Sequence, residues 1–326
     1  MKMLARIALR RVAPCSLLIT FLALSGCATI PTEVATYRQT LRHESVDGLD
    51  MAYFEAGPVS GQTIVLLHGL PTSSYLYRNV AKVLGERGYH VIVPDLIGYG
   101  ASAKPSDTAQ LAFARQAERL NLLFNRLHVS HATFVVHDMG GIVGWELLSA
   151  HPQLFDRLLI LNTTAYQRGF NPPPEMKQLA GSMGGMMSFM MQGQLLGPKL
   201  TRKFFRQFTA HPERLTKADI NQYWWPIHEG TTRSMRYMAR NFNTLIAEFP
   251  RYQTALKNFK GPTRILWGTQ DKVLEFGTIA PQFARDLETP PDRIQAVEDS
   301  GHFIQEDHPE AVVRAIETLM QAPIDR

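Results

Sequence analysis

Short, continuously apolar runs recur along the chain, and segments with helical patterning separate them. Apolar runs of this length are typical of strands that are buried on both faces of a parallel sheet. The runs that fit the pattern are Leu49–Glu55, Thr63–Leu67, His90–Val93, Thr133–His137, Leu158–Asn162, Arg264–Trp267 and Arg293–Val297. The sequence therefore predicts an α/β fold in which helices flank a mostly parallel sheet.

The strand pattern stops between Thr163 and about Phe259. Roughly ninety residues there read as helices and loops, which is a long excursion for a simple connection between strands. We therefore predict a helical cap over residues 166–259, inserted between two core segments at 40–165 and 260–326.

The first residues have the pattern of a targeting signal. A positive head, containing Lys2 and Arg11, precedes an apolar run over residues 12–24 that is too short to span a bilayer comfortably. The run ends in LSGC at 24–27, which resembles the lipobox of bacterial lipoproteins. The resemblance implies cleavage after residue 26, a lipid on Cys27 and a polar tether over 27–39. An ordinary cleaved signal or an N-terminal anchor is the alternative.

Removal of the signal changes the charge balance. The formal net charge is +5, and four positive charges lie in residues 1–26, so 5 minus 4 leaves +1. No basic surplus remains to suggest a nucleic-acid partner. The two cysteines, Cys15 and Cys27, lie in the signal and at the lipobox, so the remaining domain has no thiol pair for a disulfide. His128 and His131 lack enough neighbouring ligands to predict a metal site.

Three residues with catalytic chemistry follow predicted strands. Asp138 follows Thr133–His137, Asp271 lies just after Arg264–Trp267, and His302 lies just after Arg293–Val297. Open parallel sheets place their sites beyond the carboxyl ends of the strands. We therefore expect Asp138, Asp271 and His302 to meet in one pocket.

Four motifs resemble the haloalkane dehalogenase and epoxide hydrolase group of the α/β-hydrolases. They are HGLPTSSYLYRN at 68–79, DLIGYGASAKP at 95–105, HDMGG at 137–141 and GHFIQED at 301–307. The resemblance covers roughly residues 40–166 and 260–321. It implies that Asp138 is the nucleophile, that Asp271 orients the base His302, and that the backbone N–H groups of Leu70 and Met139 form an oxyanion hole. It implies no cofactor.

An aspartate nucleophile restricts the substrate. Because its ordinary pKa is near 3.9, the carboxylate is ionised at neutral pH and needs no base before it attacks. Attack on a saturated carbon gives a stable alkyl ester, which water activated by His302 can then hydrolyse. We therefore expect a small apolar electrophile and water as the reactants.

The leaving group divides the family. Haloalkane dehalogenases usually carry a tryptophan after the nucleophile and often an asparagine after the His-Gly pair, but Met139 and Leu70 stand at these positions and offer no side-chain N–H. The cap residues that could assist instead are Trp224 and Trp225 for a halide, and Tyr166, Tyr223 and Tyr237 for an epoxide oxygen. The sequence favours the epoxide, although epoxide hydrolases also commonly carry tryptophan where Met139 stands.

Three alternatives remain open from the sequence. The first is a haloalkane dehalogenase with a halide donor from the cap, and the second is a non-catalytic binding lipoprotein of the same fold. The third concerns the methionine-rich segment Met183–Met191, which could form a pliable substrate tunnel, or an apolar helix that covers the pocket or touches the membrane surface. The lipobox with Ala28 after Cys27 resembles lipoproteins of the outer membrane that face the periplasm.

Overall fold

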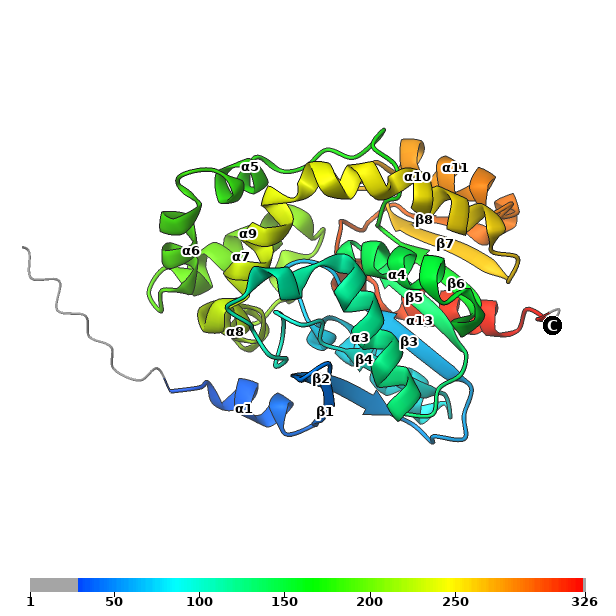
Figure 1. Cartoon of the computed structure of the whole chain (residues 1–326), viewed down its shortest axis with the longest axis horizontal. Coiled ribbons are helices and arrows are strands. Elements are labelled where there is room, and N and C mark those ends of the chain that lie inside the picture. The colour runs from blue at the N-terminus through cyan, green and yellow to red at the C-terminus, as the bar shows by residue number, and fades with distance from the viewer. Residues whose placement is uncertain (1–28, 325–326) are drawn as a thin grey trace, which may run out of the picture.

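The computed structural model describes residues 29–324, which form a sheet with helices on both faces (Figure 1). The eight strands lie in the order β1-β2-β4-β3-β5-β6-β7-β8. β1 pairs antiparallel with β2 and β2 antiparallel with β4, whereas all later neighbours are parallel. The predicted α/β fold class with a mostly parallel sheet is confirmed.

The strands have the bounds β1 Leu41–Val46, β2 Leu49–Ala56, β3 Thr63–Leu67, β4 His90–Pro94, β5 Ala132–His137, β6 Phe155–Leu161, β7 Thr263–Gly268 and β8 Ile294–Val297. The helices of the two layers over this sheet are α2 Arg78–Glu86, α3 Phe113–Arg126, α4 Met139–Ala150, α11 Phe276–Asp286, α12 Ile304–Asp307 and α13 Pro309–Met320.

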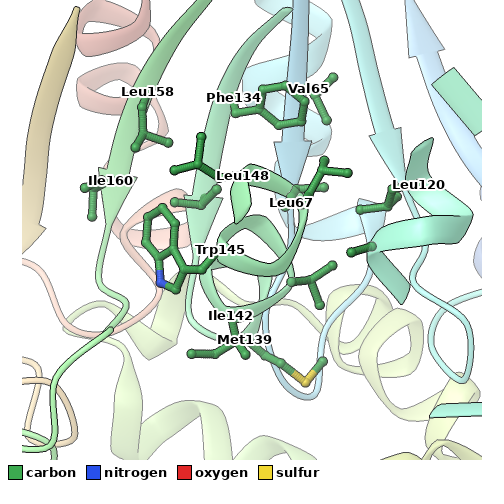
Figure 2. Packing of buried hydrophobic residues seen from close by; sticks show 14 of the residues in the cluster. Val65, Leu67, Leu120, Phe134, Met139, Ile142, Trp145, Leu148, Leu158 and Ile160 are labelled. Carbon is green, nitrogen blue, oxygen red and sulfur yellow. The ribbon is translucent and has the colours of Figure 1, made fainter. Parts of the chain in front are cut away.

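Alternation along the strands divides the core into two layers. In β3, Val65 packs with the cluster beneath α3, α4 and α11, while Leu66 packs with the cluster beneath α2 and α13. Side chains alternate between the two faces of a strand, so a continuously apolar strand supplies both clusters. Figure 2 shows Trp145 and Leu148 of α4 lying over Phe134 and Leu158 of the sheet.

Between β6 and β7 lies a helical insertion, in the interval where a cap was predicted. Its helices are α5 Pro174–Ala180, α6 Gly184–Gln192, α7 Gly197–Phe208, α8 Lys217–Pro226, α9 Thr232–Arg240 and α10 Phe242–Asn258. α5 to α9 lie at the end of the molecule opposite the C-terminus, and α10 returns the chain across α4 to the sheet (Figure 1).

The structure differs from the sequence prediction near its start. β1 was not among the predicted strands, because its burial pattern leaves only its two end residues buried. The predicted tether over 27–39 contains helix α1 Thr32–Arg38, whose Val34 is buried against Trp224 and Trp225 of α8. One buried valine among polar residues gives too weak a periodicity to indicate a helix. Within residues 29–324, no helix is long and apolar enough to cross a membrane.

Candidate active site

Asp138 lies in a sharp turn between β5 and α4. Its backbone has a positive φ of 49° and a ψ of −123°, which places its side chain at the N-terminal end of α4. Glycines make the turn possible: a Cβ on Gly69 would lie 2.3 Å from the Asp138 Cβ, and one on Gly140 would lie 2.4 Å from the Leu67 carbonyl oxygen. Such a strained turn presents a nucleophile at the edge of the sheet.

The two carboxylate oxygens of Asp138 have different partners. The Leu70 backbone N–H donates to Oδ1 at 2.6 Å, and the His302 Nε2 lies 3.5 Å from Oδ2. The side chain of Asp138 is 22% exposed, so it can be reached from a space beside it. Among the described residues no hydrogen bond joins the Met139 amide to Asp138, and its role as the second oxyanion donor stays a prediction.

Asp271 holds His302 in place. The Nδ1–H of His302 donates to Asp271 Oδ2 at 2.7 Å, and the side chain of Asp271 is fully buried. The backbone N–H groups of Val273 and Leu274 donate to the other oxygen of Asp271. The structure thus brings the three predicted residues Asp138, Asp271 and His302 into one chain of contacts.

The charges of these groups are coupled. Burial alone would raise the pKa of Asp138, but the hydrogen bond and positive charge of His302 outweigh it and lower that pKa to about 2. Burial alone would lower the pKa of His302, but the charge of Asp271 and the hydrogen bonds to Asp138 and Asp271 outweigh it and raise that pKa to about 10. The resting site is therefore an ion pair of a carboxylate and an imidazolium.

Asn162 and His137 form hydrogen bonds with residues of the site, and neither of them was predicted from the sequence to belong to it. Asn162, just after β6, donates from Nδ2 to Asp271 Oδ2 at 2.9 Å and accepts from the backbone N–H of Gly268. His137 donates from Nε2 to the His302 carbonyl oxygen at 2.9 Å, and burial lowers its pKa to about 4, so its ring is neutral. Their only sequence signal is a polar residue at the end of a buried strand.

Four of the five predicted leaving-group residues use their donors elsewhere. The Tyr223 hydroxyl donates to Glu306, and the Tyr166 hydroxyl donates to Asp286 at 3.0 Å. The Trp224 Nε1–H donates to the Met191 carbonyl oxygen and the Trp225 Nε1–H to Glu229. This corrects the sequence prediction, which saw a free N–H or O–H in each case but could not see the acceptors that the fold supplies.

Tyr237 differs from those four residues. This half-buried α9 residue shares the lining of a small cavity with Met139 and Tyr99. Within residues 29–324, the Tyr237 hydroxyl has no hydrogen-bond partner. The Tyr99 hydroxyl donates a weak hydrogen bond to the Met139 sulfur at 3.6 Å, and the pKa of Tyr99 is raised by burial and by the charge of Asp138. Tyr99 belongs to the DLIGYGASAKP motif, yet the sequence did not mark it as a site residue.

A second group of charged residues lies near the surface. The possible ligand atoms of His211, Asp299 and His308 lie within 4.8 Å of one another. The four ring nitrogens of the two histidines already contact protein oxygens, those of Asp299, Glu213 and Glu310. These contacts account for the cluster without an ion, and the site described above contains none of its residues.

Comparison with known proteins places this geometry in a family. The family described as alpha/beta hydrolase fold matches residues 62–309. The chain belongs to this family. Three similar proteins show how varied its hydrolase-fold relatives are.

A haloalkane dehalogenase of Mycobacterium marinum is 41% identical over 114 residues, and this match spans 35% of the chain and 38% of the relative. A cis-3-alkyl-4-alkyloxetan-2-one decarboxylase of Xanthomonas campestris is 28% identical over 84% of the chain and 93% of the relative. The solved structure of the epoxide hydrolase CorEH superposes with a TM-score of 0.72 at 24% identity, covering 86% of this hydrolase-fold chain and 98% of that one.

Proposed function

We propose that this protein is an aspartate-nucleophile hydrolase that opens an epoxide through a covalent alkyl ester on Asp138. One observation carries the proposal: the Asp138 carboxylate is fixed by the Leu70 N–H on one oxygen and faces His302, itself held by Asp271, with the other. A nucleophile, an oxyanion donor and an oriented base are the parts that the two half-reactions require.

In the first half-reaction, Asp138 Oδ2 attacks an epoxide carbon, and the bond between this carbon and the ring oxygen breaks. Oδ1 stays on the Leu70 N–H and becomes the carbonyl oxygen of the ester. The depressed pKa of Asp138 keeps the attacking group ionised throughout the neutral range. No base is consumed in this step.

The ring oxygen needs a proton as it becomes an alkoxide. Tyr237 and Tyr99 line the small cavity beside Met139, and in this proposal their phenols donate that proton. Tyr237 was among the candidates from the sequence, and Tyr99 replaces the tyrosines and tryptophans whose donors are bound elsewhere.

In the second half-reaction, His302 takes a proton from water, and the hydroxide attacks Cγ of Asp138. Ester formation removes the negative charge of Asp138, which is one of the causes of the raised pKa of His302. The pKa of His302 therefore falls when it must act as a base, and its proton returns through water to the phenolate. Collapse of the tetrahedral intermediate releases the diol and restores the carboxylate.

Halide release fits the site less well. Leu70 and Met139 carry apolar side chains, and the indole N–H groups of Trp224 and Trp225 donate to protein oxygens. A bromide or chloride leaving the substrate carbon that Asp138 attacks would thus lack the cap donor that the dehalogenase alternative requires. If the protein were only a binding module, the buried ionic contacts of Asp138, Asp271 and His302 would have no function that offsets the cost of burying their charges.

An oxetan-2-one is a second candidate substrate, because the Xanthomonas relative named for it aligns with 84% of this chain. Attack on the saturated ring carbon that bears the lactone oxygen would form the same ester on Asp138. The leaving group would be a carboxylate, which needs no proton from the site. This candidate therefore predicts ester formation that does not depend on Tyr99 or Tyr237.

The experiment that tests the proposal traps the ester. The His302→Gln variant is incubated separately with epoxides, bromoalkanes and a 3,4-dialkyl-oxetan-2-one, and intact mass and the peptide containing Asp138 are measured. We expect a gain equal to the full epoxide mass. A gain equal to a bromoalkane less HBr would establish dehalogenation, and a gain only from the lactone would establish the second candidate. The control, Asp138→Asn in the same background, should gain nothing; no gain from any panel by the folded variant would overturn the proposal.

We also propose that the protein is lipid-anchored through Cys27 and faces the periplasm from the outer membrane. The support is the sequence LSGC at 24–27, which lies outside the described residues. The intact mass of the membrane-extracted protein should show a diacylglyceryl group and an N-acyl chain on residue 27. A soluble chain that begins at any other residue, or a Cys27→Ser variant that still partitions into detergent, would contradict the anchor.

A further inference from the structure

Exposed apolar side chains gather on one part of the insertion. Nine large hydrophobic residues are exposed within residues 29–324, and seven of them lie on α6, on the first turn of α7 or in the segments that flank these helices. We call this set the α6–α7 patch: Met183, Met186, Phe189, Met190, Leu195, Leu196 and Leu200. Phe189 and Leu195 are 74% and 75% exposed. A contiguous apolar surface of this kind marks a contact with a partner or with a membrane.

The charges within the segment that carries the patch have one sign. Between Glu175 and Glu213 the sequence contains no acidic residue. It contains five basic ones, Lys177, Lys199, Arg202, Lys203 and Arg206, and all of these except Arg202 are exposed. Apolar residues with Lys and Arg beside them are the composition of surfaces that lie in the interface of anionic bilayers.

The start of the described chain lies beside the same surface. Thr29 and Pro31 line a shallow hollow together with Gln194 and Pro198, which flank Leu195 and Leu196. α1 is fixed there because the Asn221 side chain of α8 donates to Glu33 at 2.6 Å. Cys27, the proposed lipid attachment site, precedes Thr29 by two positions in the sequence. An acyl anchor at residue 27 would therefore hold the α6–α7 patch against the bilayer.

A groove between α6 and α9 begins at Phe189 of the patch and includes Tyr237. Its lining includes Phe189 and Gln192 of α6 and Arg233, Arg236 and Tyr237 of α9. Tyr237 also lines the small cavity beside Met139, so the two spaces share one wall residue. The groove would bring a molecule that leaves the bilayer at Phe189 as far as Tyr237, one of the two proposed proton donors.

We propose that the α6–α7 patch docks on an anionic phospholipid bilayer and that the groove admits apolar substrates from it. A second copy of this chain fits the patch less well, because a two-fold contact would bring the same surface of both copies together. The basic residues of the two copies would then repel each other, because the segment between Glu175 and Glu213 has no acidic residue to neutralise them. Anionic headgroups instead neutralise Lys199, Lys203 and Arg206 while the apolar side chains enter the acyl boundary.

The test measures vesicle binding without the anchor. A chain that begins at Thr29 retains all the elements and both core clusters described above, so it can be used in flotation assays. We expect it to float with vesicles of phosphatidylethanolamine and phosphatidylglycerol, and about a hundredfold less with phosphatidylcholine alone, because each of three basic residues near an anionic surface strengthens binding about fivefold. The paired change Met183→Ser and Leu195→Ser should weaken binding about tenfold.

A matched control comes from exposed apolar residues elsewhere. Val59 and Leu122 are 68% and 40% exposed but lie outside the patch, so Val59→Ser with Leu122→Ser should leave vesicle binding unchanged. Equal flotation of the patch variant and this control, or no flotation of the unchanged chain, would overturn the proposal. Concentration-dependent dimers that the patch variant abolishes, without vesicle binding, would assign the patch to a second copy and overturn it too.

This test separates docking from catalysis, because flotation with vesicles does not require turnover. Substrate delivery does rest on the proposed function. It predicts that the patch variant loses turnover of a bilayer-partitioned epoxide relative to that of a water-soluble epoxide, measured as the ratio of the two rates. An unchanged ratio would overturn delivery while leaving docking in place.

Discussion

The strand-end site and the helical insertion differ in how completely their side chains find partners. At the strand ends, Asp271 accepts four hydrogen bonds and His302 is held between two carboxylates. In the insertion, the Tyr237 hydroxyl lacks a described partner and the α6–α7 patch is exposed. The charged residues of the site lie where strands fix the backbone. The insertion, which we propose contacts the substrate and the bilayer, keeps side chains that can adapt to different partners.

The comparison shows for which residues a role can be inferred from the sequence. Asp138, Asp271 and His302 were expected together because parallel strands leave no other arrangement for their ends. The roles of Tyr166, Tyr223, Trp224 and Trp225 depended on how helices pack, and the fold gave each of them a different acceptor. The predictions below test the two regions separately, starting with the largest effect.

Removing the nucleophile should have the largest effect. Asp138→Asn keeps the size of the side chain but removes its charge, and the amide cannot form the ester. We expect turnover to fall by about 10⁴-fold or more, as for other groups that act covalently. Steady-state kinetics on the best substrate of the trapping panel measures this. A variant that stays folded and retains turnover within tenfold of the original would show that Asp138 is not the nucleophile.

Removing the base should slow only the second half-reaction. His302→Gln cannot activate water. We therefore expect a burst in which one equivalent of ester forms per enzyme molecule, followed by turnover about 10³-fold slower than that of the unchanged protein. Rapid-quench measurement of the ester on Asp138 separates the two steps. If ester formation slowed as much as its hydrolysis, His302 would have a role in the attack as well.

The proposed proton donors allow a comparison within one residue type. Tyr99→Phe combined with Tyr237→Phe should lower the rate of ester formation from an epoxide by about 10²-fold, because general acid catalysis contributes that much. Tyr166→Phe removes a hydroxyl that is bound to Asp286 and should leave this rate unchanged. Equal effects of the two variants would remove Tyr99 and Tyr237 from the mechanism.

The smallest effect concerns stability and pH. The pKa of His302 is raised in the folded protein to about 10, so its ion pairs stabilise the fold below the unfolded pKa of about 6.5 and this contribution is lost as pH rises through about 10. Urea unfolding between these pH values should therefore show a falling free energy of unfolding. His302→Gln should lack this part of the pH dependence, and parallel curves for the two proteins would contradict the assigned coupling.

The sequence predicted the sheet and the strand-end residues because both depend on local patterns. Continuous apolar runs predict buried strands, and Asp138, Asp271 and His302 each come just after such a run. β1 escaped notice because most of its residues face water, and α1 because a single buried valine carries its contact with α8.

The missed support residues have a common physical cause. Asn162 matters because its amide reaches a carboxylate more than a hundred positions away along the chain, and His137 because its ring meets the backbone of His302. Such contacts depend on the packing of distant segments, which leaves no periodic trace in the sequence. Tyr99 lies near Met139 for the same reason.

The hydrogen bond from the Leu70 N–H to Asp138 Oδ1 has an isotopic consequence. Since Oδ1 is held and only Oδ2 reacts, the proposed mechanism transfers an oxygen of the protein itself to the first product molecule. The oxygen of water enters the vacated Oδ2 position and leaves with the product of the next cycle. In water enriched in oxygen-18, the first product should be unlabelled and the second fully labelled, whereas a freely rotating carboxylate would give a half-labelled second product.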